Sequence, residues 1–422
     1  GASGWITVQG GGRMGKLEGE VEELKKLVKQ QAAAMKVVKK SEKKRLAEED
    51  LEQIRALIRA EAGNGGHVGN VWSNLDVQLY GFIKLDAAWD GARMSVGTFA
   101  RWVETGDFNG SDHEFNMTAN QTRLGLKIKG PDVGPAKTSG QVEIDFYGGG
   151  AENKPHPFMR HAFMKIDWPE HRFSIIAGQT WDVISPLNAP TLNYSVLWWV
   201  GNVGYRRPQI RATKEFTIAK NVDLKLEVAL LRSIGHSHTF DPGDTGEDSG
   251  MPSIQGRASV TFPLFGEKRT TVGVSGHYGK EEYDLSVDGK HMNVASWSAN
   301  LDVKMPINDW LTVQGELYTG QDTDAYLGGI GQGVDVQGNS ITELKSCGGW
   351  IAASLGPWDK WKVNVGAGVD SVNDEDFSSP STLASPKRTF NSCIFGNVIY
   401  ALNANTSVGV EISHWKTDYH QQ

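Results

Sequence analysis

The feature that most constrains this chain is a regular alternation of short and long connections between strands. From Leu75 onward we predict fifteen strands, at 75–90, 115–130, 138–148, 157–168, 173–184, 209–217, 221–235, 252–264, 269–284, 292–306, 311–320, 341–355, 361–372, 388–402 and 407–422. The short connections have the sequences PDVGPAK, PEHR, IAKN, FGEK, INDW, GPWDK and NANT. A β-sandwich has no reason to sort its loops by length, whereas an outer-membrane barrel has short periplasmic turns and long external loops. The pattern therefore predicts an all-β transmembrane barrel.

The polarity of the strands supports this prediction. In VEIDFYG, at 142–148, Val142 and Ile144 share one face while Glu143 and Asp145 share the other. Acidic pairs in a dry core would be very costly without partners. We therefore expect the polar faces to line a wet lumen and the apolar faces to meet lipid. Tryptophans beside the short turns are typical of an interfacial girdle, and they are Trp168, Trp310, Trp358 and Trp361.

Composition agrees with an all-β chain but does not distinguish a membrane protein from a soluble one. The 422 residues include 50 glycines and 14 tryptophans, which favours short strands and tight turns. No apolar run approaches the roughly 18 residues of a transmembrane helix. A soluble β-protein, with the tryptophans at one end of it, remains the alternative.

Strand parity predicts a further strand. If all short turns lie on the periplasmic side, the fifteenth strand ends outside. Single-chain bacterial barrels have an even number of strands. We therefore expect 16 antiparallel strands, with the last one absent from this sequence, after Gln422.

The first part of the chain has a different character. We expect residues 1–13 to be a flexible N-terminus and 63–74 a Gly-rich hinge. Between them, 14–62 forms a heptad pattern that predicts a periplasmic α-helical coiled coil of about 70 Å. Its apolar seam is Val21, Leu24, Val28, Met35 and Val38, with Gln31 inside it, and then Leu51, Ile54 and Ile58. A single solvated helix or a disordered basic arm is the alternative, and the pattern does not separate a dimer from a trimer.

The segment 185–208 is the expected constriction of the pore. It contains an apolar run, LWWV at 197–200, and ends in basic residues. Because an exposed run of this kind promotes aggregation, we predict that it is buried, either folded into the lumen as the constriction or packed against a neighbouring subunit. Guanidinium groups near it would hold carboxylates bidentately, and the candidates are Arg123, Arg160, Arg206, Arg207 and Arg211. The alternative is that they pair with lumen-facing counter-charges, for which we name Lys84, Asp86, Glu143 and Asp145.

Nothing in the sequence indicates catalysis, a cofactor or a metal centre. G-x-S-x-G, H-E-x-x-H and phosphate-loop motifs are absent from it. The acidic loops at 241–248 and 370–377 do not have EF-hand spacing, so we predict no metal site. Cys347 and Cys393 are expected on non-adjacent strands and opposite faces, which disfavours a disulfide.

Several motifs resemble the DcaP-like porins. They are YGFIKLDAAWD, NQTRLGLKIKG, VEIDFYGGG, MRHAFMKI, IIAGQTWDVISP and RRPQIR, and they lie in order over about residues 78–213. The resemblance implies a trimeric outer-membrane barrel of sixteen strands with a periplasmic N-terminal coiled coil. It also implies passage of small organic anions, such as dicarboxylates, past a constriction formed by the five arginines above. The long basic helix and the absent closing strand depart from the family pattern.

The expected function is an outer-membrane porin, a passive diffusion channel for small hydrophilic solutes that prefers organic anions. The expected partners are outer-membrane lipid and lipopolysaccharide, further copies of the chain in a trimer, and no nucleic acid. The alternative is a structural anchor whose basic coiled coil tethers the barrel to peptidoglycan or another envelope layer.

Overall fold

The computed structural model describes residues 2–10, 75–105, 112–149, 154–235, 245–285, 290–337, 340–382 and 385–420, and only the backbone of 2–10. The predicted coiled coil at 14–62 and the hinge at 63–74 lie outside these residues. Among the described residues, no helix has both the length and the apolar character needed to cross a membrane.

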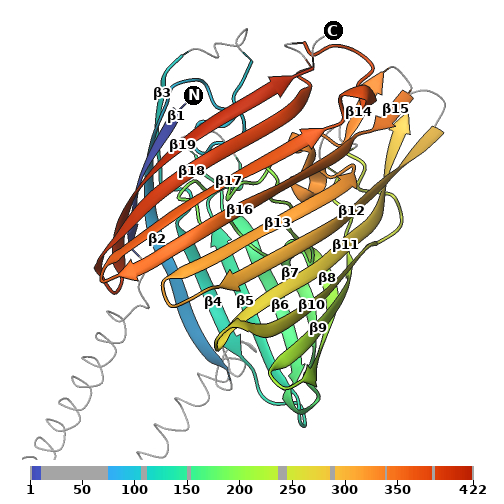
Figure 1. Ribbon diagram of the computed structural model, residues 1–422. Helices are drawn as coiled ribbons and strands as arrows, with labels where there is room; N and C mark the ends of the chain where they lie inside the picture. Colours follow the sequence, from blue (N-terminus) through green and yellow to red (C-terminus); the bar gives the residue numbers. More distant parts are fainter. Residues whose placement is uncertain are drawn as a thin grey trace, which may run out of the picture.

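The chain forms one large antiparallel sheet that curves around an interior (Figure 1). Its strands are β1 (Ala2–Gly10), β2 (Asp76–Asp90), β3 (Glu114–Thr118), β4 (Arg123–Lys129), β5 (Lys137–Asp145), β6 (Phe158–Trp168), β7 (Phe173–Trp181), β8 (Arg206–Ala219), β9 (Val222–Leu231), β10 (Ser253–Phe265), β11 (Lys268–Leu285), β12 (Lys290–Pro306), β13 (Leu311–Gln321), β16 (Lys345–Trp358), β17 (Trp361–Val372), β18 (Arg388–Asn403) and β19 (Thr406–Tyr419). Each strand from β4 to β19 pairs with the next strand of this list. The predicted strands are confirmed, with ends that differ by a few residues.

One predicted strand, 115–130, is divided in two. β2 pairs with β4 along its first half, from Asp76 to Phe82, and with β3 along its second half, from Asp86 to Asp90. A turn closed by a hydrogen bond from the amide of Thr122 to the carbonyl of Ala119 separates the two pieces. β3 and β4 therefore occupy one position in the sheet, and the strands of the described residues fill sixteen positions.

The predicted position of the sixteenth strand in the sequence, after Gln422, is wrong. Ala2–Gly10 was expected to be flexible, but it forms β1, which pairs antiparallel with β19 on one side and with β2 on the other (Figure 1). The pairings thus lead from β2 around the sheet to β19 and, through β1, to β2 again. Parity fixes the number of strands, but a strand that needs only two neighbours can come from either end of the chain. The segment therefore does not have to follow Gln422.

The sheet has an inverted distribution of polarity. Apolar side chains of the strands are exposed, among them Ile83 at 72%, Ile210 at 62% and Ile412 at 67%. Polar side chains that alternate with them are buried, including Asp145 at 0% and Glu411 at 1%. This confirms the predicted facing of the strands. Such a surface suits an apolar solvent outside and a polar interior.

Two connections fill much of the interior, and buried residues of the β2–β3 connection, such as Met94, pack in the same clusters. The first joins β7 to β8, and the second joins β13 to β16 and contains η2 (Asp324–Tyr326), η3 (Gly329–Gly331) and a hairpin of β14 (Val334–Gln337) and β15 (Ser340–Glu343). Two further short helices, η1 (Pro169–His171) and η4 (Asp374–Asp376), lie in other connections. Buried apolar residues of both connections, such as Trp198, Trp199 and Leu327, pack in one cluster. The core therefore lies inside the curved sheet.

Candidate functional site

The connection between β7 and β8 crosses the interior and packs against the opposite wall. Leu197 and Val200 are fully buried and contact Trp350 of β16 and Phe395 of β18. Glycines make this approach possible, since a β-carbon on Gly368 of β17 would collide with the carbonyl oxygen of Val200. An L side chain in place of the glycine would push the connection away from the wall.

Polar side chains of the wall bind the backbone of this connection. Glu411 accepts hydrogen bonds from the amides of Leu192 at 2.6 Å and Asn193 at 3.3 Å. The other bonds, with donor first, are Leu187 N to Glu316 Oε1 at 2.8 Å, Asn397 Nδ2 to Pro190 O at 2.8 Å, Lys84 Nζ to Leu192 O at 2.7 Å and Asn391 Nδ2 to Trp199 O at 2.9 Å. Buried backbone groups need such partners, so the polar wall holds the connection in place.

A β-bulge determines where Arg160 lies. Strict alternation would put Arg160 and His161 on opposite faces, but both are buried. The register between β5 and β6 shifts here, because Glu143 pairs with His161 while Ile144 pairs with Met159. The extra residue turns inward, and Arg160 lies 2.6 Å from Glu143 and 2.7 Å from Asp145. Its charge is therefore compensated by two carboxylates.

Arg206 and Arg207 are adjacent in sequence but have different surroundings. Nε of Arg207 lies 2.9 Å from Oδ1 of Asp182, and its Nη2 donates to the carbonyl of Ala325 at 2.9 Å. Arg206 is 1% exposed, and its three nitrogens have no hydrogen-bond partner among the described residues. Its guanidinium carbon lies instead near four aromatic rings, at distances of 4.5 Å (Trp181), 5.2 Å (Tyr205), 5.4 Å (Phe158) and 5.7 Å (Trp198). Cation–π attraction compensates part of its lost hydration.

Burial keeps the phenols beside Arg206 neutral. It raises the pKa of Tyr194 and of Tyr205 above the ordinary value, although the charge of Arg206 acts in the opposite direction. At neutral pH these rings carry no charge. They therefore contribute their faces and dipoles, and leave the positive charge of Arg206 without a formal counter-ion.

Three adjoining cavities follow the inner wall formed by β6 to β10. The outer one, about 310 Å³, is aromatic and includes Phe99, Tyr147 and Tyr194. The middle one, about 240 Å³, shares Trp198 and Tyr205 with the outer cavity. The third, which we call the inner cavity because it lies at the end of the short turns, has about 440 Å³ and reaches the turn at Arg172. These cavities form a row from the end of the long connections to the end of the short turns.

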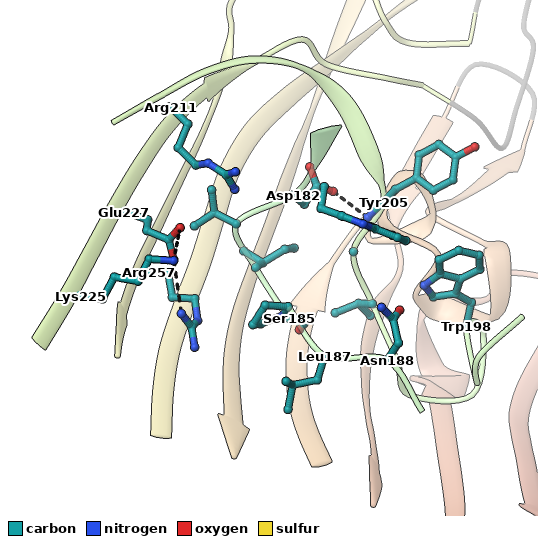
Figure 2. A pocket seen from close by; sticks show the side chains of 16 residues that line it. Asp182, Ser185, Leu187, Asn188, Trp198, Tyr205, Arg211, Lys225, Glu227 and Arg257 are labelled. Atoms are coloured by element: carbon teal, nitrogen blue, oxygen red, sulfur yellow. Dashed lines mark hydrogen bonds and ion pairs between the residues drawn. The ribbon is translucent and has the colours of Figure 1, made fainter. Parts of the chain in front are cut away.

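The middle and inner cavities share three charged residues, Arg211, Lys225 and Glu227. Figure 2 shows Arg211 apart from the paired groups Glu227 and Arg257. Lys225 lies 2.9 Å from Glu227, and Arg257 lies 2.7 Å from Asp302. In the described part of the chain, Arg211 has no carboxylate within ion-pair distance, and its buried Nε has no hydrogen-bond partner. Arg211 is thus a cation of this wall that no carboxylate of the described residues contacts.

No protein-family model matches the sequence, and no curated protein matches it. Among solved structures, the chain is similar to the outer membrane channel DcaP of Acinetobacter baumannii, with 20% identity and a TM-score of 0.63 over 82% of this chain and 98% of that one. The chain thus shares the fold of DcaP. Lower similarity is found to a variant of the outer membrane protein OmpT of Vibrio cholerae that lacks loop L8 (10% identity, TM-score 0.46, 81% and 100% of the two chains) and to an anion-selective porin from Comamonas acidovorans (12%, 0.42, 81% and 100%).

Within this channel fold, the predicted arginines do not form one ring. Arg160 and Arg207 are paired with carboxylates, Arg206 lies behind aromatic rings, and Arg211 faces the cavities. Arg123 lies near the ring of Phe82, at 5.2 Å. Of the predicted counter-charges, Glu143 and Asp145 bind Arg160, while Lys84 pairs with Asp86 at 3.1 Å.

Sequence reasoning missed several residues that line or support the channel fold. Lys225, Glu227 and Arg257 line the middle cavity, and Glu316 and Glu411 hold the crossing connection. All five alternate with outward-facing apolar residues. The signal was therefore the same period of two, in strands where the motifs were less distinctive.

Proposed function

We propose that this chain is an outer-membrane porin, a closed barrel that serves as a passive diffusion channel for small hydrophilic solutes and prefers organic anions such as dicarboxylates. The inverted polarity of the sheet and the channel fold support a place in the outer membrane. The row of cavities along β6 to β10 supports a path for solutes. We further propose that the barrel is a homotrimer in contact with lipid and lipopolysaccharide, with residues 14–62 as a periplasmic coiled coil.

The single observation that carries the anion preference is the state of Arg211. It lines two of the three cavities and has no ion pair with any described residue, whereas Lys225, Glu227 and Arg257 beside it are paired. A unit charge about 10 Å away at an effective dielectric constant of about 20 changes the energy of a monovalent ion by about 1–2 kcal/mol. An uncompensated cation in a narrow path therefore favours anions measurably.

The test is the reversal potential in a planar bilayer under a salt gradient. We compare the full-length protein with Arg211→Gln, which removes the charge of the path. The control is Lys360→Gln, which removes one positive charge from an exposed turn away from the cavities. Heat-modifiable migration in gels checks that each variant folds.

We expect the wild type and Lys360→Gln to prefer anions. Arg211→Gln should lower the ratio of anion to cation permeability about fivefold, as a change of about 1 kcal/mol requires. Equal selectivity in all three proteins would contradict the role of Arg211. Absence of conductance in the correctly folded wild type would contradict the porin itself. The tether alternative depends on residues 14–62, and the same recordings separate it from a channel.

A further inference from the structure

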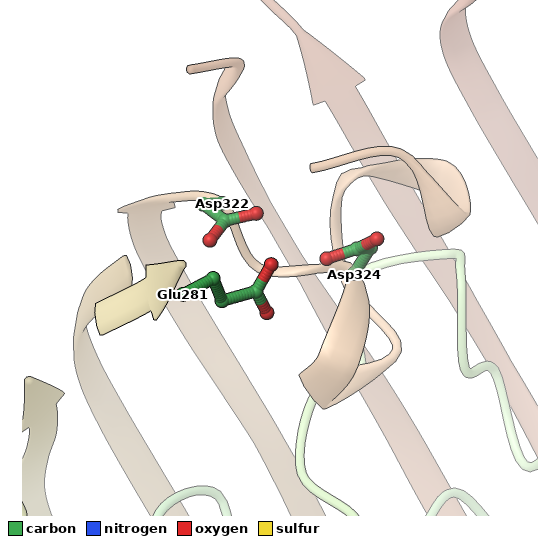
Figure 3. Close-up of side chains that lie close together, drawn as sticks. All are labelled: Glu281, Asp322 and Asp324. Atoms are coloured by element: carbon green, nitrogen blue, oxygen red, sulfur yellow. The ribbon is translucent and has the colours of Figure 1, made fainter. Parts of the chain in front are cut away.

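Three buried carboxylates meet near the outer end of the sheet, beside Ala325, whose carbonyl Arg207 contacts. Glu281 belongs to β11, Asp322 follows the last residue of β13, and Asp324 begins η2. One oxygen from each lies within 4.8 Å of the others, and Figure 3 shows the three groups turned toward one another. Their exposures are 3%, 0% and 0%.

Hydrogen bonds do not account for this arrangement. The hydroxyl of Tyr283 donates to Oε2 of Glu281 at 2.6 Å, and the amide of Ala325 donates to Oδ1 of Asp324 at 2.8 Å. Both oxygens of Asp322 and Oδ2 of Asp324 have no hydrogen-bond partner in the described residues. A buried carboxylate without a partner is strongly destabilising. The fully buried Asp322 is thus directed at two other acids, and no described residue of opposite charge is bound to it.

The charged groups around the cluster do not neutralise it. Arg207 is the nearest basic residue that acts on Glu281, but it is engaged by Asp182 and by the ring of Tyr326, whose centre lies 3.9 Å away. His277 stacks on the same ring and bonds to two serines. Burial, and then the charges of Glu281, Asp324 and Glu343, raise the pKa of Asp322. The electrostatic potential at Asp322 is therefore negative.

The geometry points to a binding site for one hard divalent cation, Ca²⁺, held by Glu281, Asp322 and Asp324. All donors are carboxylate oxygens, which Ca²⁺ prefers and accepts in flexible geometry at 2.3–2.6 Å. Two oxygens bound to one such ion lie no more than about 5 Å apart, and the three oxygens here lie within 4.8 Å of one another. Gly333 borders the carboxylates, and a β-carbon there would collide with Oδ1 of both aspartates. The sequence predicted no metal site because these residues are distant along the chain.

A cation here would support the crossing connection. Two carbonyls shortly after Asp324 accept hydrogen bonds from backbone amides of the crossing connection. The amide of Gly204 donates to the carbonyl of Tyr326 at 2.8 Å, and the amide of Trp199 donates to the carbonyl of Leu327 at 2.9 Å. Ca²⁺ would fasten η2 to β11 and so fix the segment on which Trp199 rests. The site thus couples the outer loops to the constriction, whatever ion the channel prefers.

The experiment uses the full-length protein in detergent, freed of metal with a chelator and dialysed. Tb³⁺ replaces Ca²⁺ as a probe, because its luminescence is sensitised by nearby tyrosines such as Tyr283. Thermal unfolding is then followed with added Ca²⁺ and with chelator. Asp322→Asn removes one ligand charge at constant shape, Glu281→Gln is the second variant, and Glu375→Gln is the control in an exposed part of η4.

We expect one Tb³⁺ that Ca²⁺ displaces, and unfolding at a higher temperature in Ca²⁺, for the wild type and Glu375→Gln. Asp322→Asn and Glu281→Gln should lose both effects. In chelator, Asp322→Asn should unfold at a higher temperature than the wild type, because it removes the cost of burying an acid beside two others without a cation. Equal Tb³⁺ binding by the wild type and Asp322→Asn would overturn the proposal. So would an unchanged unfolding temperature of the wild type at Ca²⁺ up to about 10 mM, above the range usual for extracellular modules.

Discussion

Nε of Arg207 lies 2.9 Å from Oδ1 of Asp182, while the preceding residue, Arg206, has no carboxylate partner in the described structure. The Arg207 contact is an ion pair between two buried groups. Both side chains are 1% exposed. Two neighbouring arginines therefore have different roles, and substitutions should separate them.

Arg207→Met should destabilise the barrel by about 3–5 kcal/mol, because it leaves the Asp182 carboxylate buried without its cation. Arg206→Met is the matched control, since it removes a charge without leaving an acid unpaired and puts an apolar chain among aromatic rings. The measurement is urea unfolding in detergent followed by tryptophan fluorescence. Equal losses in the two variants would contradict this assignment.

Gly368→Ala should displace the crossing connection from β17. The added methyl group would collide with the carbonyl of Val200, and overpacking of this kind costs about 1–3 kcal/mol. We expect a lower unfolding midpoint and a changed single-channel conductance. Gly396→Ala is the control, because a β-carbon at Gly396 meets only an ordinary contact with Val365. An unchanged conductance in Gly368→Ala would argue against contact between this connection and the wall.

Glu411→Gln should loosen the same connection near Leu192. Glu411 accepts hydrogen bonds from two backbone amides, and in the variant one of these amides would face the side-chain amino group of the glutamine. An unsatisfied buried donor of this kind costs about 1–3 kcal/mol. Single-channel recordings should show more frequent transitions between conductance levels. Glu375→Gln, an exposed acid, should behave as the wild type. If Glu411→Gln gave equally quiet recordings, this hydrogen bond would not be needed to hold the connection.

Acid should weaken the outer loops through Asp335. Burial alone would raise the pKa of Asp335, but Lys387 at 2.7 Å and two donors of Ser378 lower it below the ordinary value. A lowered pKa gives stability that is present above the unfolded value of about 3.9 and is lost as the pH falls through the folded value. We expect the unfolding midpoint of the wild type to fall more steeply below about pH 4 than that of Asp335→Asn. Parallel curves would contradict this.

The sequence by itself determined the strands and their facing. A period of two is a local property, since residues two apart share a face whatever the strand pairs with. For this reason Glu143 and Asp145 were assigned to the interior correctly, and the positions of β2 to β19 differ little from the predicted ranges. The apolarity of the LWWV segment at 197–200 predicted that it is buried, but not whether the lumen or a neighbouring subunit covers it.

Only the tertiary structure decided which distant segments meet. Pairing chose Ala2–Gly10 as the neighbour of β19, and a shift of register turned Arg160 inward. Contacts across the interior gave Arg207 a carboxylate and left Arg211 without one. They also brought Glu281 beside Asp322 and Asp324. These outcomes depend on distances between segments far apart in the chain, and a local pattern of polarity carries no information about such distances.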